Sequence, residues 1–96
     1  MTDNYRTIEG KLARLEEFKG NSMSAITYSR GSIEIYEVYS YSTVVARVST
    51  HTDGITYEVN RAVAISKNHW GNTSGRHINL CRRLLPGGAD AVELEG

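Results

Sequence analysis

The middle of the chain, residues 20–67, consists of short segments rich in β-branched and aromatic residues, each ending at a cluster of turn-forming residues. This composition is typical of strands joined by tight turns. We predict strands over residues 24–29, 33–41, 43–50 and 55–67. The turn before the last strand contains Asp53-Gly54, a pair that favours the positive φ angles of a hairpin. Because such short connections join strands that run in opposite directions, an antiparallel meander is expected and parallel pairing is not.

The N-terminal segment, residues 4–19, has the spacing of an amphipathic helix. The apolar side chains that recur on one face are Tyr5, Ile8, Leu12 and Leu15. Asp3 is placed to cap the first turn, and Gly20 is placed to end the helix. Gly10 lies inside the segment and costs about 1 kcal/mol relative to alanine. The helix is therefore predicted in spite of one unfavourable residue.

A second helix is predicted over residues 74–85. Thr73 or Ser74 can accept hydrogen bonds from the amides of its first turn, and the Pro-Gly-Gly sequence that starts at Pro86 cannot continue it. The apolar face consists of Ile78, Cys81, Leu84 and Leu85. The tail that follows, residues 89–96, is expected to be loosely docked.

These elements predict an α+β domain. The sheet of about four strands is expected to be an antiparallel meander, with the N-terminal and C-terminal helices packed on one face. The 96 residues are expected to form a single domain, 1–96, with one modest core. One cysteine excludes an internal disulfide framework. The apolar runs are much shorter than a membrane helix requires, and the start lacks a secretion signal, so a cytoplasmic protein is expected.

Positive charge is concentrated late in the chain, although the formal net charge is zero. Residues 60–89 contain basic residues and neither Asp nor Glu. A polar helix start beside a guanidinium suits a phosphate or carboxylate. The predicted binding residues are Arg61, Lys67, Trp70, Ser74, Arg76, His77, Arg82 and Arg83. The alternative is structural, because a helix start needs a cap and arginines near a helix end interact favourably with its dipole.

Catalytic and metal-binding patterns are weak in this sequence. His77 and Cys81 lie four residues apart on one helical face, but a structural zinc ion needs four ligands. Cys81 is expected in the core, where a thiol is not activated for catalysis. Glu34 and Glu37 are expected on solvated faces and not as an acid–base pair. We therefore predict no cofactor, no metal and no enzymatic activity.

Three stretches carry a resemblance: residues 18–22 (FKGNS), 39–43 (YSYST) and 73–80 (TSGRHINL). They resemble a family of small uncharacterised proteins from bacteriophages of actinobacteria and related prophages. The resemblance covers residues 18–83, and Gly75 departs from the family's uninterrupted Thr-Ser-Arg-His-Ile-Asn run. It implies an accessory protein made during infection, in the host cytoplasm, and it supplies no binding residues.

Two functions follow as hypotheses. The first is a small non-enzymatic phage accessory protein that binds a host macromolecule, above all a host protein. An exposed edge strand is the natural docking surface, and the same edges can pair two copies into a homodimer. The alternative is a nucleic-acid-binding protein that uses the basic segment 60–85, with tyrosines on which bases stack. No membrane partner is expected.

Overall fold

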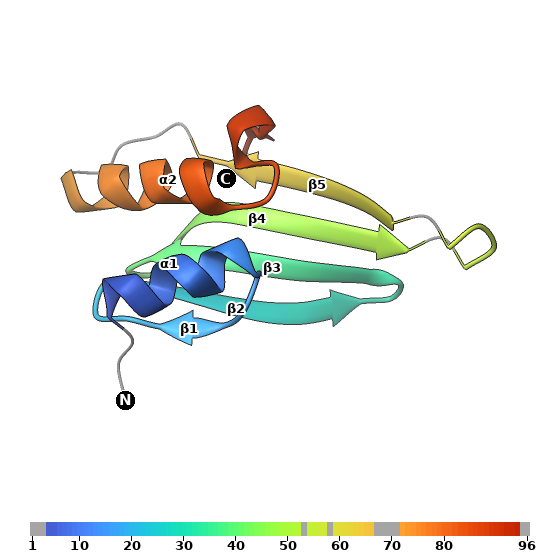
Figure 1. Cartoon of the computed structure of the whole chain (residues 1–96), viewed down its shortest axis with the longest axis horizontal. Helices are drawn as coiled ribbons and strands as arrows, with labels where there is room; N and C mark the ends of the chain where they lie inside the picture. The colour runs from blue at the N-terminus through green and yellow to red at the C-terminus, as the bar shows by residue number, and fades with distance from the viewer. Residues whose placement is uncertain (1–3, 53, 58, 67–71, 95–96) are drawn as a thin grey trace.

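The fold is a mixed sheet with both helices on one face, as Figure 1 shows. The computed structural model describes residues 4–52, 54–57, 59–66 and 72–94. In chain order the elements are α1 (Tyr5–Ala13), β1 (Phe18–Lys19), β2 (Met23–Arg30), β3 (Ile33–Ser40), β4 (Thr43–Thr52), β5 (Val59–Ile65), α2 (Asn72–Leu84), the 3-10 turn η1 (Gly88–Asp90) and β6 (Val92–Glu93). The predicted α+β class is therefore confirmed, but the sheet has six strands where about four were predicted.

The strands lie in the order β1-β2-β3-β4-β5-β6. From β1 to β5 each pair is antiparallel, as predicted. A bulge interrupts the β3–β4 pair, where Val38 faces Ala46 but Tyr39 faces Val44. The extra residue is Val45, and both Val45 and Ala46 are fully buried. The bulge thus places two consecutive side chains of one strand in the core.

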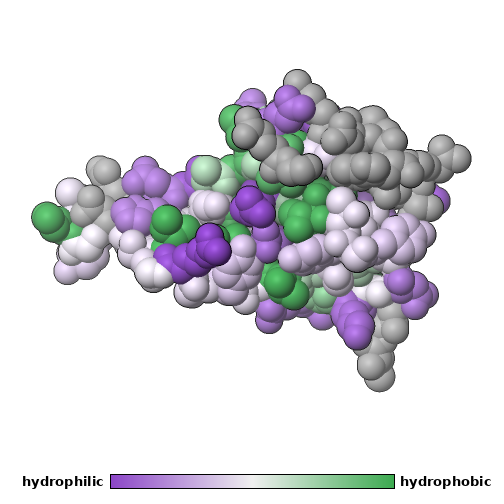
Figure 2. Space-filling view, turned by 180° about the vertical axis from the view of Figure 1, so that it is seen from behind, coloured by the Kyte–Doolittle hydropathy of each residue, from purple (hydrophilic) through white to green (hydrophobic). Residues whose placement is uncertain are grey.

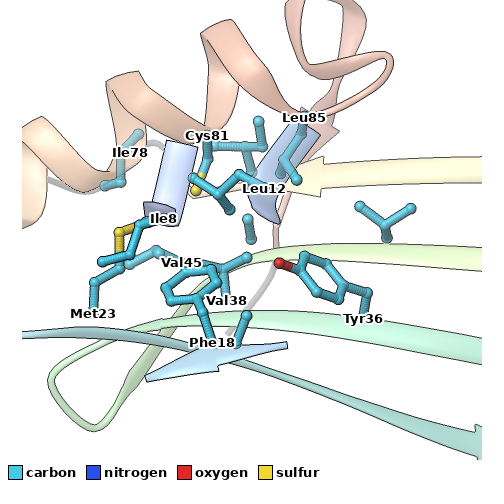
Figure 3. Close-up of a cluster of buried hydrophobic side chains, with 14 residues drawn as sticks. Ile8, Leu12, Phe18, Met23, Tyr36, Val38, Val45, Ile78, Cys81 and Leu85 are labelled. Carbon is cyan, nitrogen blue, oxygen red and sulfur yellow. The ribbon is translucent and has the colours of Figure 1, made fainter. Parts of the chain in front are cut away.

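The core lies between the sheet and the helices (Figure 3). Side chains from α1, α2 and the sheet form its cluster, among them Ile8, Leu12, Val38, Val45, Ile78, Cys81 and Leu85. Tyr36 also lies in this cluster, and its hydroxyl donates a hydrogen bond of 2.8 Å to the carbonyl oxygen of Glu16. The bond satisfies the polar end of a buried ring and fixes the connection between α1 and β1.

Helix α1 is shorter than predicted. It ends at Ala13, and Leu15 adopts a positive φ of 56° that turns the chain back toward the sheet. The chain then continues into β1, where Phe18 becomes part of the core. The helix begins after Asn4, whose Oδ1 accepts a hydrogen bond of 3.0 Å from the amide of Thr7. The predicted cap, Asp3, lies outside the described residues.

The C-terminal tail corrects two predictions. It is not loose over its described length, because η1 leads into β6, which pairs parallel with β5. Parallel pairing was predicted to be absent, but α2 lies between β5 and β6 and supplies the long crossover that a parallel pair needs. Gly88 permits the close return of the chain, because a Cβ there would lie 2.6 Å from the carbonyl oxygen of Arg82.

Candidate protein-binding surface

The connection between β4 and β5 exposes large apolar side chains. Residues 54–56 form a turn, and β5 begins only at Val59, so the strand predicted from residue 55 starts later than expected. Ile55 is 90 % exposed, Tyr57 is 79 % exposed and Val59 is 59 % exposed. This connection projects beyond the body of the sheet in Figure 1, and hydrophobic surface is visible at the same end in Figure 2. We call Ile55, Tyr57 and Val59 the apolar tip.

The outer edge of β5 continues from the apolar tip. On its inner side β5 pairs with β4 from Val59 to Ile65, whereas on its outer side β6 pairs only with Ala64 and Ile65. Within the described part of the chain, no strand covers the outer edge from residue 59 to residue 63. The side chains of residues 59–62 are all exposed. Such an edge offers free backbone donors and acceptors to an incoming strand.

The opposite side of the sheet is better protected. There β1 pairs with Ser24 and Ala25 of β2. Just beyond this pair, the Glu17 carboxylate accepts a hydrogen bond of 2.7 Å from the amide of Thr27. Because this carboxylate already accepts a hydrogen bond from an edge amide, that amide is not available to pair with an incoming strand. The negative charge at the edge also disfavours an apolar segment there. The β5 edge is therefore the more accessible of the two.

Of the predicted arginines that the structure describes, only Arg76 and Arg83 line the same groove. Arg76 and Arg83, seven residues apart on α2, line a shallow groove between the helices with a volume of about 440 Å³. Glu9 of α1 lines the same groove, and its carboxylate lies 4.0 Å from the Arg83 guanidinium. Arg82 is exposed but does not line the groove, and Arg61 is exposed on β5. The structure thus brings two of these arginines together and partly neutralises one.

His77, predicted as a binding residue beside Arg76, is fully buried. Its Nδ1 lies 2.7 Å from the Ser40 hydroxyl, and its Nε2 lies 3.4 Å from the Ser22 hydroxyl. Burial, together with the positive charge of Arg76, lowers the pKa of His77. A fully buried ring is not accessible to a ligand at the surface, so the binding role predicted for His77 does not fit its position. The imidazole instead joins α2 to the sheet.

The other predicted residues add little to a site. Of Ser74 the structure describes the backbone, which lies in α2, while Lys67 and Trp70 lie outside the described residues. Cys81 is buried as expected, and burial raises the pKa of its thiol to about 12, so the thiol stays protonated. Among residues 4–52, 54–57, 59–66 and 72–94, no cluster of His, Cys, Asp or Glu is suited to hold a metal ion.

A carboxylate on the sheet face opposite the helices escaped the sequence prediction. Glu37 was expected to be solvated, but it is only 5 % exposed. Arg47 Nε donates to its Oε2 at 2.8 Å, and the Tyr39 hydroxyl donates to its Oε1 at 3.3 Å. Burial alone would raise the pKa of Glu37, but the hydrogen bonds from Arg47, Tyr28 and Tyr39 and the charge of Arg47 outweigh burial and lower it. The burial of Glu37 depends on partners from neighbouring strands, and the spacing of residues along the sequence does not show which residues pair across strands.

Comparison with known proteins gives no relative: no family model, curated protein or solved structure matches the chain. Within the described residues, no helix combines the length and apolar character needed to cross a membrane.

Proposed function

We propose that this protein is a small non-enzymatic binding protein that acts on a host protein during phage infection, by accepting an extended segment of that protein along the outer edge of β5. The single observation that carries the proposal is the outer edge from residue 59 to residue 63, which no strand in the described part of the chain covers and which adjoins the apolar tip. Backbone hydrogen bonds to such an edge give affinity, and neighbouring side chains select the partner.

The side chains along this edge define the chemistry of the partner segment. Val59 and Arg61 face the same side of the sheet, because side chains alternate along a strand. A segment paired with β5 would present an apolar side chain to Val59 and an acidic one to Arg61, since directly opposed residues share a face. At the apolar tip, complete burial of a side chain such as Ile55 contributes about 1.5–3 kcal/mol. The apolar tip therefore contributes binding energy, and pairing with the edge aligns the partner segment with β5.

The test is capture of partners from host lysate followed by measurement with the purified partner. We expect a protein that binds the wild type and is lost with the double variant Ile55→Ser/Tyr57→Ser, whose apolar contacts are removed. Arg76→Ala is the matched control, because it changes the helix groove and leaves the β5 edge intact. Calorimetry should show a Kd at least about tenfold weaker for the double variant. A Kd unchanged by these substitutions would place binding elsewhere.

A second candidate, a nucleic-acid-binding protein using segment 60–85, is favoured by the exposure of Arg76 and Arg83 in one groove. Phosphate contacts by these guanidinium groups predict binding that weakens steeply with salt. Fluorescence anisotropy with single-stranded DNA at low salt tests it, and Arg76→Ala/Arg83→Ala should abolish the signal. Unchanged anisotropy of the wild type at low salt would remove this candidate.

A further inference from the structure

The sheet face opposite the helices is a surface that the proposed β5 binding leaves unused. Both helices pack on the other face, and in the described part of the chain no helix covers this one (Figure 1). Its central side chains come from β2, β3, β4 and β5 in two neighbouring rows of the register. One row is Tyr28, Ile35, Ser49 and Ala62. The next row is Ile26, Glu37, Arg47 and Ala64.

We propose that this face packs against the same face of a second copy of the chain, in a homodimer with a two-fold axis that runs along the strands between β3 and β4. The proposal does not depend on the β5 edge. It rests on the charge, the size and the arrangement of the side chains on this face.

The charged pair at the centre of the face is already arranged for cover. Glu37 and Arg47 form an ion pair in which Arg47 Nη2 lies 2.6 Å from the Glu37 Oε2. The tyrosine hydroxyls of Tyr28 and Tyr39 donate further hydrogen bonds to the same carboxylate. A charge that is buried without partners costs several kcal/mol, whereas one that is paired and hydrogen-bonded costs much less. Cover by a second copy would therefore leave no carboxylate oxygen unpaired.

The sizes of the side chains select the second copy and its orientation. The β2–β3 half of the two rows carries the large apolar side chains Ile26, Tyr28 and Ile35. The β4–β5 half carries the small side chains Ser49, Ala62 and Ala64, with Arg47 as its one large side chain. A two-fold axis along the strands lays the raised half of one copy over the low half of the other. The same axis places Arg47 of one copy over Glu37 of the other, a residue of opposite charge. It also keeps the two sets of strands close to parallel, as in aligned sheet packing.

The charge and the area of the face fit a weak dimer. The formal net charge of the chain is zero, so two copies do not repel each other strongly. With a strand spacing of about 4.8 Å and a rise of about 3.3 Å per residue, four strands over seven residues cover roughly 19 by 23 Å. This footprint, roughly 900 Å² for both copies, is smaller than that of stable interfaces and falls in the range of weak, transient ones. We therefore expect dissociation in the micromolar range.

The experiment is sedimentation velocity over a concentration series, with a swap of side-chain size between the facing strands. In the proposed dimer Ile26 of one copy faces Ala64 of the other. Ile26→Ala should weaken dimerisation by about tenfold or more, because it opens a gap at both symmetric positions. Ala64→Ile alone should also weaken it, and the double variant should restore it to within about threefold of the wild type. Circular dichroism verifies that each variant is folded.

Two controls separate this proposal from binding at the β5 edge. Ala13→Lys, on the exposed side of α1, and Ile55→Ser, at the apolar tip, should both leave the dimer unchanged. A wild type that sediments as a monomer at several hundred micromolar overturns the proposal. So does a double variant that stays dissociated, a dimer lost through Ile55→Ser, or a monomer whose sheet face binds nucleic acid instead.

Discussion

Replacing Ser40 by alanine tests whether the buried contact between β3 and α2 stabilises the fold. Ser40 is 2 % exposed, and its hydroxyl lies 2.7 Å from the Nδ1 of the fully buried His77. Alanine would place a methyl group against that ring nitrogen, where water has little access. Removing one partner of a buried hydrogen bond costs about 1–3 kcal/mol. For a domain of this size we expect the melting temperature to fall by at least about 4 °C.

Urea unfolding at pH 7, followed by circular dichroism, measures this loss. Ser42→Ala is the matched control, because Ser42 is exposed in the turn between β3 and β4 and should change the free energy of unfolding by less than about 0.5 kcal/mol. A Ser40→Ala variant as stable as the Ser42→Ala variant would refute the reasoning. It would show that the imidazole does not depend on this hydroxyl.

Three further predictions concern stability. The pKa of His77 in the folded protein is lowered below its ordinary value of 6.5, which applies to the unfolded chain. Between these two pKa values the unfolded chain therefore binds more protons than the folded protein. The free energy of unfolding should fall as the pH is lowered from 7.5 to 5.5, and it would stay constant if the ring were solvated. Glu37→Ala should lower the free energy of unfolding, measured in urea, by about 1–2 kcal/mol, because it removes the hydrogen bonds to the carboxylate. An unchanged urea midpoint would show that these hydrogen bonds do not stabilise the fold. Gly88→Ala should cost about 1–3 kcal/mol because its Cβ would lie 2.6 Å from the Arg82 carbonyl oxygen, whereas Gly54→Ala, in open space, should be neutral by thermal unfolding.

The elements that sequence predicts well are those with local signals at both ends. Strands β3 and β4 closely match the predicted 33–41 and 43–50, because alternating side chains lie between clear turns; Gly31, just before β3, has a φ of 60°. Helix α2 ends within one residue of its predicted end, where Pro86 prevents its continuation. In these segments local preference and tertiary packing agree.

The elements that sequence misses depend on distant partners. The stretch from Leu15 to Phe18 fits a helical pattern, but Phe18 instead packs in the core as part of a two-residue strand. Strand β6 is also two residues long and has no repeating pattern to detect. Ile55 and Tyr57 have strong strand preference, yet they lie in the connection ahead of β5. Short strands form because a neighbouring strand is present, and that information is not local.

The same contrast between local signals and distant partners applies to the candidate surfaces. The helical spacing of Arg76 and Arg83 places them together, because residues seven apart share a helix face. The burial of Glu37 requires Arg47 and Tyr28, which reach it from the strands on either side of β3. Sequence periodicity gives the face of a side chain but not its neighbour across the sheet. A polar residue that alternates onto an uncovered face can therefore be read as solvated and still be enclosed.

The two proposed surfaces are compatible in one assembly. A two-fold axis between β3 and β4 places the β5 edges of the two copies on opposite sides of the dimer, and face-to-face packing leaves the backbone groups along each edge pointing outward. The connections between β4 and β5, which carry Ile55 and Tyr57, extend past the ends of the strands (Figure 1). A dimer would therefore present two equivalent edges to a partner, and a host protein with two accessible segments would bind more tightly than either edge alone allows. Because dimerisation is expected only at micromolar concentrations, this gain would depend on the amount of protein made during infection.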